Sequence, residues 1–398
     1  MGETVVVTGC GVISPLNPDG ETGRFWAALR AGEDAVLPVR SFDASAYPCR
    51  VAAEIPRGML ELSDGEDPAM RMARIAFRKA IVDAGPGHGS AEPTRTGVVL
   101  GTVLGGVSSG DRYIRTPGLD PENARRLLLQ YPMRGLAASL AAEAGIRGPV
   151  LTVSTACASG TDAIGLAFRK IRGGEADVVL AGGVDALCEF SFSGFSALNA
   201  LTPGKVRPFS KNRSGLALGE GAVFLVLERE RSATARGARI LGRVAGYASA
   251  VDATHLTAPH RDGRGLSAAA TAAIREAGLD PDGIDYVSAH GTGTLYNDCM
   301  ETRALKTALG RRAGVVPVSS IKAILGHAFG AAGAMEALAC LLAIRDGIVP
   351  PTANFEEPDP ECDIDCVPNR ERSVTVRAAL SLSAGFGGQN AALVLARG

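Results

Sequence analysis

Cys157 stands in a run of small residues, Val153-Ser-Thr-Ala-Cys-Ala-Ser-Gly160, directly after an apolar segment. The pattern predicts a buried strand that turns at once into a helix, with the thiol at the turn. A helix N-terminus carries partial positive charge, which favours a thiolate, and small neighbours leave room for a substrate carbonyl. Cys157 is therefore a candidate nucleophile, placed like the serine of a nucleophile elbow. The alternative interpretation is a buried cysteine that only fills space.

Two of the five histidines lie in glycine-rich turns. His290 stands in Ser288-Ala-His-Gly-Thr-Gly-Thr294, and His327 stands five residues after Lys322, in Leu325-Gly-His-Ala-Phe-Gly-Ala-Ala-Gly333. A Gly-Thr-Gly-Thr turn could also hold an anion, but it lacks the Gly-Lys-Ser/Thr ending of a phosphate loop. A single histidine in such a place is most often a core residue, whereas two such turns favour chemistry.

The residue types leave two reactions to compare. A cysteine with one histidine, oriented by an Asn or Asp, would suit a cysteine hydrolase. Two histidine turns and a lysine suit carbon–carbon bond formation better. That reaction needs a nucleophile to hold one acyl chain, and donors for the enolate that forms when a second thioester loses CO2. Neutral imidazoles with Nε–H donors would serve that oxygen.

The elements that position these residues alternate between short apolar runs and helical stretches, which predicts an α/β fold with buried sheets covered by helices. The 398 residues exceed one ordinary domain, and we expect two similar halves, 1–230 and 231–398. Strands are expected at 4–8, 97–101, 150–153, 177–181, 222–227, 240–250, 284–288, 315–319, 374–383 and 391–395, and helices at 21–31, 70–84, 135–144, 161–172, 266–277, 301–309 and 333–345.

Composition excludes several classes of function. The net charge of −1 gives no bulk attraction to nucleic acid or to an anionic membrane. No apolar run approaches the ~20 residues that span a bilayer, and no signal segment is visible. Eight cysteines form no disulfide framework. Cys362 and Cys366 make a CxxxC pair without a second pair, which is a weak zinc signal. We expect a cytoplasmic protein with reduced thiols, no metal and no cofactor.

Four ordered motifs carry a resemblance: VSTACASG, SAHGTGTxxND, IKxxLGHxxGAAG and GFGGQN. Together they resemble the β-ketoacyl-[acyl-carrier-protein] synthases of the elongating type, a group that includes type II polyketide ketosynthases. The likeness extends from Val5 to the last strand and includes Arg207-Pro-Phe and Gly219-Glu-Gly-Ala222. It implies the thiolase-like fold, with two similar halves stacked as α-β-α-β-α layers, usually in a dimer.

The resemblance also implies roles for individual residues. Cys157 would be acylated from an acyl carrier protein, and His290 and His327 would promote malonyl decarboxylation and polarise the thioester carbonyl. Lys322 would support the histidines. The backbone N–H groups of Cys157 and Phe386 would form the oxyanion hole, with the Phe386 ring as a gate. Further matching positions are the supporting residues Glu301, Glu336, Asn297, Asp298, Thr292 and Thr294, and Leu104 in the acyl pocket.

Some positions depart from the family pattern. Gln389 stands where Thr is common, Ser210 follows Arg-Pro-Phe where Asp is usual, and the stretches 106–149 and 201–207 are short. Because of these departures, a type II polyketide or polyene ketosynthase is an alternative to an enzyme of primary fatty-acid synthesis. A homodimer and a heterodimer with a chain-length partner both stay open.

Two alternative functions and one surface also follow from the sequence. One alternative is a non-elongating acyltransferase or cyclising enzyme that uses Cys157. The other is a non-catalytic partner subunit, which the presence of Cys157 argues against. Four basic residues on one predicted helix are candidates for carrier docking, although a solvated helix face accounts for them as well. They are Arg71, Arg74, Arg78 and Lys79.

Overall fold

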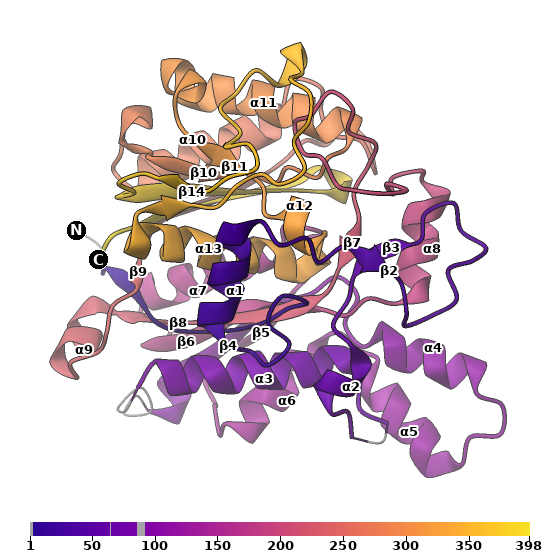
Figure 1. Ribbon diagram of the computed structural model, residues 1–398. Coiled ribbons are helices and arrows are strands. Elements are labelled where there is room, and N and C mark those ends of the chain that lie inside the picture. The colour runs from indigo at the N-terminus through magenta and orange to yellow at the C-terminus, as the bar shows by residue number, and fades with distance from the viewer. Residues whose placement is uncertain (1–2, 64, 86–91) are drawn as a thin grey trace.

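The computed structural model describes residues 3–63, 65–85 and 92–398. Within them, ten strands form one hydrogen-bonded sheet in the order β11-β10-β14-β15-β9-β1-β8-β6-β4-β5. The sheet is bent into an upper and a lower half, with helices between them (Figure 1). The lower half holds β1 (Val5–Ile13), β8 (Gly221–Arg229), β6 (Val178–Asp185), β4 (Thr96–Gly101) and β5 (Val150–Val153), and the upper half β9 (Gly242–Val251), β15 (Gln389–Ala396), β14 (Ala378–Gly385), β10 (Tyr286–Ser288) and β11 (Val318–Ser319).

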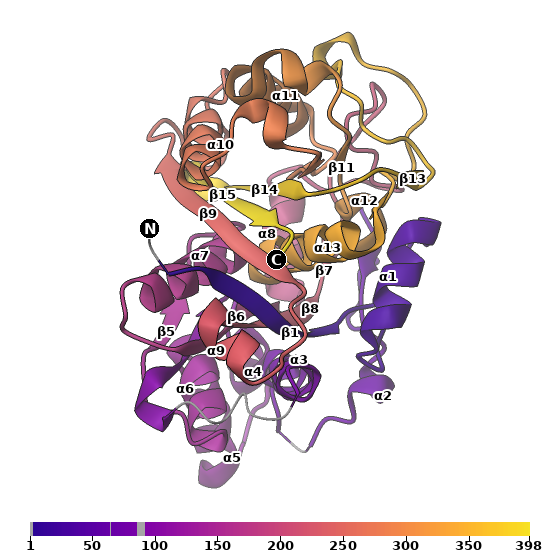
Figure 2. The same cartoon turned by 90° about the vertical axis from the view of Figure 1, so that its left-hand side faces the viewer.

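The two halves of the sheet meet at a short antiparallel ladder between β1 and β9. Val5, Val6 and Val7 pair with Val244, Arg243 and Gly242, and the two strands then diverge, as Figure 2 shows. Every residue of β1 is buried, because helices cover the lower half of the sheet on both faces. This is why β1 is rich in apolar, β-branched residues instead of alternating with polar ones.

Helices complete five layers. The outer layer of the upper half contains α10 (Arg264–Glu276) and α11 (Leu295–Leu309), and that of the lower half contains α3 (Pro68–Asp83) and α6 (Arg134–Glu143) (Figure 1). Between the half-sheets lie α7 (Ser159–Arg172) and α13 (Ala332–Asp346). The α-β-α-β-α arrangement implied by the sequence motifs is confirmed.

Several smaller elements lie outside the layers. The sequence pattern did not predict α4 and α5, which are short and carry many exposed polar residues, nor the short α8. The smaller helices are α1 (Thr22–Ala31), α2 (Arg57–Leu60), α4 (Val107–Arg115), α5 (Pro121–Gln130), α8 (Glu189–Ala197), α9 (Glu230–Ala235) and α12 (Lys322–Leu325). One small sheet is formed by β2 (Leu37–Pro38), β3 (Val51–Ala53) and β7 (Leu218–Gly219), and another by β12 (Ile348–Val349) and β13 (Arg372–Ser373). No helix in the described part of the chain is long and apolar enough to cross a membrane.

The helix α3 shows how local signals and surface charge work together. Asp67 caps its N-terminus by accepting a hydrogen bond from the Ala69 N–H at 2.9 Å, and proline occupies the first position of the helix. Each of its four basic candidates for carrier docking is in an ion pair: Arg71 with Glu61, Arg74 with Glu66 and Glu143, Arg78 with Glu143, and Lys79 with Glu21. This pairing favours the interpretation of α3 as a solvated, charge-balanced face.

The two central helices approach each other closely at their N-termini. A Cβ added at Gly160 of α7 would lie 2.5 Å from the Gly330 carbonyl oxygen, and one added at Gly333 of α13 would lie 2.0 Å from Thr161 Oγ1. Only glycine allows backbones to come this near. The close approach brings the turn before α7, which carries Cys157, next to the turn before α13, which carries His327.

Candidate active site

Cys157 lies at a tight turn between β5 and α7, as predicted. Its neighbour Ala156 adopts a left-handed conformation, with φ of 51°, which is strained for a residue with a Cβ. Gly385 at the end of β14 packs on this turn, since a Cβ there would lie 3.0 Å from the Cys157 nitrogen. The Cys157 residue is only 8% exposed. The turn therefore projects Cys157 into the space between the two half-sheets.

The two histidines reach the same place from the other half of the chain. His290 follows β10, and His327 precedes α13. The Cys157 Sγ and one ring nitrogen of each histidine all lie within 4.8 Å of one another. The imidazoles are 5.4 Å apart between ring centroids and nearly perpendicular. The three residues singled out from the sequence thus lie together, the thiol from the lower half and both imidazoles from the upper half.

A cavity of about 320 Å³ opens over these three side chains. Phe386, which the resemblance implied as a gate, and Thr292, Thr294 and Asn297, which it implied as supporting residues, also line it. Apolar residues form much of its mouth, and they include Phe195, Leu198, Leu295 and Tyr296. Its size and mixed lining suit an acyl thioester better than a small charged substrate.

Hydrogen bonding determines the tautomer of His327. Its Nδ1 accepts a hydrogen bond from the Phe329 N–H at 3.2 Å, so in the neutral ring the proton is on Nε2. That Nε2 is buried and has no hydrogen-bond partner among the described residues. Burial holds the pKa values of His327 and His290 well below 6.5, and the nearby Lys322 charge lowers both further. Both rings are therefore neutral at pH 7, and the Nε2–H group of His327 is available to donate a hydrogen bond to a ligand.

Lys322 supplies the positive charge of the site from beneath it. Its side chain is buried and its Nζ donates a hydrogen bond to Glu336 Oε1. Burial raises the pKa of the Glu336 carboxyl to about 7, and Lys322 opposes that shift. The same ammonium lowers the pKa of Cys157. Lys322 and Glu336 thus act on the site through charge, without lining the cavity.

Three supporting residues hold the His290 turn from α11, which begins at Leu295, earlier than the sequence predicted. Glu301 accepts hydrogen bonds from the backbone N–H groups of His290 at 2.6 Å and Gly291 at 2.7 Å. Asp298 accepts from the Gly293 N–H, and Asn297 donates to both carboxylates. Burial raises the pKa of Glu301 to about 7. The first two turns of α11 therefore fix the backbone that carries His290.

The protonation state of Cys157 corrects one expectation from the sequence. Burial raises the pKa of the thiol to about 11, although Lys322 and the backbone N–H groups of Phe386 and Cys157 itself lower it. Desolvation therefore outweighs the helix N-terminus, and the resting residue is a thiol instead of a thiolate. A thiol in this state would need a base to take its proton before it could act as a nucleophile, and a neutral imidazole is within reach.

We expect the alkylation of Cys157 by iodoacetamide to accelerate about tenfold per pH unit between about pH 6 and 9, because the thiolate fraction grows in that proportion below the pKa. The rate would be measured by mass spectrometry of the peptide that carries Cys157. A cysteine peptide with an ordinary pKa of ~8.5 serves as the control and levels off within this range. A plateau for the protein below about pH 8 would show that the thiolate already exists at rest, against the effect of burial.

Phe386 contributes both a backbone N–H donor and an aromatic ring to the site. Its N–H and that of Cys157 both lower the pKa of the thiol, so both donors point to the region where charge would develop. Its ring stacks on Phe195 at 5.4 Å between centroids, and Phe195 makes an edge contact with Phe329. The Phe329 ring in turn stacks on His327 at 5.8 Å. Sequence reasoning missed Phe195, because nothing in its surroundings distinguishes it from an ordinary core aromatic.

Leu104 lies deeper than the acyl-pocket role implied. It is absent from the described residues that line the cavity, and it packs in an apolar cluster with Phe192 and Phe329. Asp185, another residue that sequence reasoning missed, accepts hydrogen bonds from the Leu104 N–H at 2.8 Å and the Gly330 N–H at 2.7 Å. Leu104 thus packs in the same cluster as Phe329, outside the cavity lining, and the hydrogen bonds to Asp185 tie it to the His327 turn.

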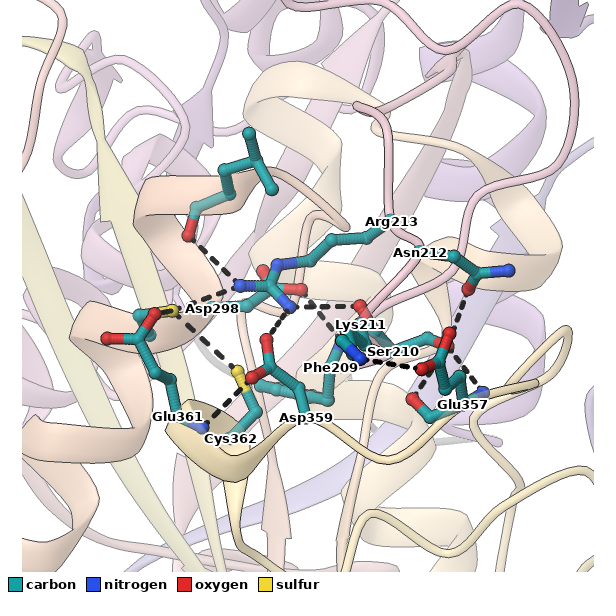
Figure 3. Close-up of polar contacts among 12 residues, drawn as sticks. Phe209, Ser210, Lys211, Asn212, Arg213, Asp298, Glu357, Asp359, Glu361 and Cys362 are labelled. Carbon is teal, nitrogen blue, oxygen red and sulfur yellow. Dashed lines mark hydrogen bonds and ion pairs between the residues drawn. The ribbon is translucent and has the colours of Figure 1, made fainter.

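Among the described residues, the possible metal ligands grouped with Cys362 do not include Cys366, its partner in the weak CxxxC signal. Cys362 places its sulfur 4.0 Å from that of Cys299 on α11 (Figure 3). Both belong to the apolar cluster of the upper half, as does Cys366. The spacing in the sequence therefore gave no useful guide to this group of thiols.

Comparison with known proteins agrees with the fold and the site. The two half-sheets with a shared central helix layer place the chain among thiolase-like enzymes. Residues 2–233 match the N-terminal domain of beta-ketoacyl synthases and residues 241–356 match the C-terminal domain, so the chain belongs to the beta-ketoacyl synthase family. The resemblance seen in the four motifs is confirmed.

Similar proteins fall into two groups. The tetracenomycin polyketide synthase ketoacyl synthase alpha subunit of Streptomyces glaucescens is 40% identical, over 99% of this chain and 97% of its own. The 3-oxoacyl-[acyl-carrier-protein] synthase 2 of Synechocystis sp. is also 40% identical, over 98% and 97%. A solved structure described as the ishigamide ketosynthase/chain length factor is 38% identical, with a TM-score of 0.94 over the full length of both chains.

Proposed function

We propose that this chain catalyses decarboxylative condensation of an acyl chain, held as a thioester on Cys157, with a malonyl group on an acyl carrier protein. The observation that carries the proposal is the meeting of one thiol and two neutral imidazoles in one cavity, within 4.8 Å. A hydrolase needs a single base beside its nucleophile. Here a second imidazole and the buried Lys322 are present as well, and they suit the stabilisation of an enolate.

In the first half-reaction, Cys157 attacks the carbonyl carbon of the incoming acyl thioester. Its proton passes to a neutral imidazole, and the thiol of the carrier leaves with a proton. The negative oxygen of the intermediate lies toward the N–H groups of Cys157 and Phe386, which need no rearrangement to receive it. The acyl chain passes the Phe386 ring, and we propose that it extends toward Leu104 once the stack of Phe386 on Phe195 opens.

In the second half-reaction, the malonyl carbon–carbon bond breaks and CO2 leaves. The electron pair forms an enolate, and the His327 Nε2–H, together with His290, donates to its oxygen. The enolate carbon then attacks the acyl carbonyl, and the Cys157 thiolate leaves. Lys322 favours each negative species and keeps both imidazoles neutral, because its positive charge lowers their pKa values. Glu301, Asp298 and Asn297 hold the His290 turn in position, and Thr292 and Thr294 line the approach.

For the partner and pathway, we propose a type II polyketide or polyene system in the cytoplasm, in which this chain is the condensing subunit beside a chain-length partner. The name of the relative from Synechocystis includes an acyl carrier protein, and the ishigamide structure is described as a ketosynthase/chain length factor. The strand β5, directly before the Cys157 turn, is an edge strand with half-buried residues. A partner seated along this edge would cover the underside of the turn. We also propose that the halves divide at residues 230 and 231.

The test combines the purified protein with several acyl carrier proteins loaded with acyl chains, with and without malonyl carrier protein. We expect acylated protein in the first case, and a β-ketoacyl product longer by two carbons in the second. Both would be weighed by mass spectrometry, alone and with a candidate chain-length partner. Acylation without elongation in every combination would contradict condensation and favour the non-elongating transferase.

A further inference from the structure

Cys299 and Cys362 form a dithiol group beneath the surface of the upper half, apart from the cavity. Cys299 belongs to α11, and Cys362 ends a short 3-10 helix, Pro360–Cys362. Their sulfur atoms are 4.0 Å apart, so the two thiols are in direct contact (Figure 3). A disulfide needs about 2 Å between sulfurs, a gap that side-chain rotations can close when the backbones already pack together.

Arg213 makes one of these thiols the better nucleophile. Its Nη2 donates a hydrogen bond to Cys299 Sγ at 3.0 Å, and its side chain is buried in an ion pair with Asp359. Burial raises the pKa of the Cys299 thiol, and the Arg213 charge opposes that shift. The pKa of Cys299 stays raised overall, so the resting residue is a thiol, but the guanidinium in hydrogen-bond contact eases formation of the thiolate, which is the form that attacks oxidants. The donating geometry thus assigns Cys299 as the attacking thiol and Cys362 as the resolving one.

The pair lies shallow enough for a small oxidant to reach. Cys299 is 8% exposed and Cys362 is 5% exposed. The neighbouring Glu361 carboxylate lies 3.7 Å from Cys299 Sγ, on a side chain that is 63% exposed. A rotation of this side chain would open a path from solvent to the sulfur of Cys299.

We propose that Cys299 and Cys362 are a redox modification site, converted to a disulfide by a hydroperoxide. The Cys299 thiolate attacks the peroxide oxygen, the O–O bond breaks, and an alcohol or water leaves with one proton. Cys362 then attacks the sulfenic acid sulfur, a S–S bond forms, and water leaves. The two thiols lose two electrons and two hydrogens, and the peroxide is reduced by the same two electrons.

Formation of the disulfide would change the structure of the active site through the contacts of Arg213 and α11. Arg213 also donates to the Thr294 and Leu295 carbonyls at 3.3 Å, and both residues line the cavity. Closing the S–S bond changes the sulfur that accepts the hydrogen bond from this guanidinium and draws it toward Cys362. Cys299 also lies on α11 between Asp298 and Glu301, which hold the His290 turn. Oxidation therefore displaces the supports of one wall of the cavity.

A metal site and inert packing are the two alternatives to a redox role for these thiols. With Asp359 they resemble part of a zinc site, since one ligand atom of each lies within 4.8 Å of the others. Arg213 already supplies the positive charge there, so a metal ion would have to displace a buried guanidinium. In the second alternative, both cysteines only fill the apolar cluster. Cys366 lies in the same cluster and has no sulfur partner among the hydrogen bonds of the described residues, so it serves as the matched control.

The first experiment does not depend on the proposed function. The full-length Cys157→Ala variant, which lacks the competing nucleophile, is treated with hydrogen peroxide and digested with trypsin without reduction. We expect the peptide that ends at Arg303 to be linked to peptide 346–370, with a mass lower by two hydrogens. The second peptide carries both Cys362 and Cys366, so the link should persist with added Cys366→Ala and vanish with Cys362→Ala. No link, or a link that survives Cys362→Ala, would overturn the proposal.

The second experiment tests the effect on condensation, and this part does rest on the proposed function. Wild type and Cys362→Ala carry the same Cys157, so peroxide damages that nucleophile equally in both. We expect wild type to lose at least about fivefold more activity than Cys362→Ala, with dithiothreitol restoring the difference. Equal losses of activity in the two proteins would overturn the proposed effect on the active site, but would not contradict formation of the disulfide. A stoichiometric zinc complex that is lost with Cys299→Ala would overturn the redox assignment in favour of a metal site.

Discussion

Replacing Cys157 with alanine is expected to abolish both acylation and condensation. The side chain supplies the only thiol among the residues that line the cavity in the described structure, and no hydroxyl there stands at the turn between β5 and α7. Loss of a covalent nucleophile lowers the turnover rate by roughly 10⁴-fold or more. Mass spectrometry after incubation with acyl carrier protein would show no mass gain on the protein, and product analysis would show no β-ketoacyl chain.

A matched control separates this loss from a loss of folding. Cys366→Ala removes a thiol of similar burial from the apolar cluster of the upper half, away from the cavity. We expect it to acylate at the wild-type rate, and thermal unfolding should show both variants folded. If Cys157→Ala still condensed acyl chains, the assignment of the nucleophile would be wrong.

Replacing His327 should separate the two half-reactions. We expect His327→Ala to accept an acyl chain from its carrier but to decarboxylate malonyl carrier protein about 10²–10³-fold more slowly, the usual effect of removing one oxyanion donor. The reason is the Nε2–H of His327, which has no partner among the described residues and is free for an enolate oxygen. Release of CO2 and gain of acyl mass would be measured in parallel.

Two further substitutions at the same position test the tautomer. Asparagine can accept from the Phe329 N–H as Nδ1 does, but it has no donor near the position of Nε2. Glutamine places an N–H donor near that position and loses the acceptor. We expect His327→Gln to retain more decarboxylation than His327→Asn. The opposite order, or equal loss of both half-reactions in His327→Ala, would contradict the division of roles.

The strands and the main motifs were accessible from the sequence for a physical reason. Strands buried on both faces must be continuously apolar, so β4 and β8 were predicted within a few residues of their observed limits. The half-buried edge strand β5 was predicted with its observed limits from its short apolar run. Turns that must come close to another backbone need glycine and other small residues, which is why the Cys157, His290 and His327 turns stood out. These signals depend only on local geometry.

What escaped prediction depends on contacts between distant segments. The helix α11 begins six residues before the predicted Glu301, because Asn297 and Asp298 are polar residues buried on its inner face. Asp298 accepts hydrogen bonds from the backbone N–H groups of Gly293 and Phe209, and Asn297 donates to the neighbouring carboxylates; no periodicity in the sequence indicates these contacts. The same holds for the pKa of Cys157, which burial decides, and for Cys299 and Cys362, which are far apart along the chain.

The short ladder between β1 and β9 has a consequence for how the protein is made. The ribosome completes the lower half, with Cys157, before β9, Lys322 and either imidazole exist. Domains tend to fold as units during synthesis, starting with the N-terminal part. A nascent lower half would hold a thiol with no base and no ammonium beside it, hence one slow to react with acyl thioesters. We therefore expect reactivity to arise only when the last strands dock, so that unfinished chains would not capture substrate.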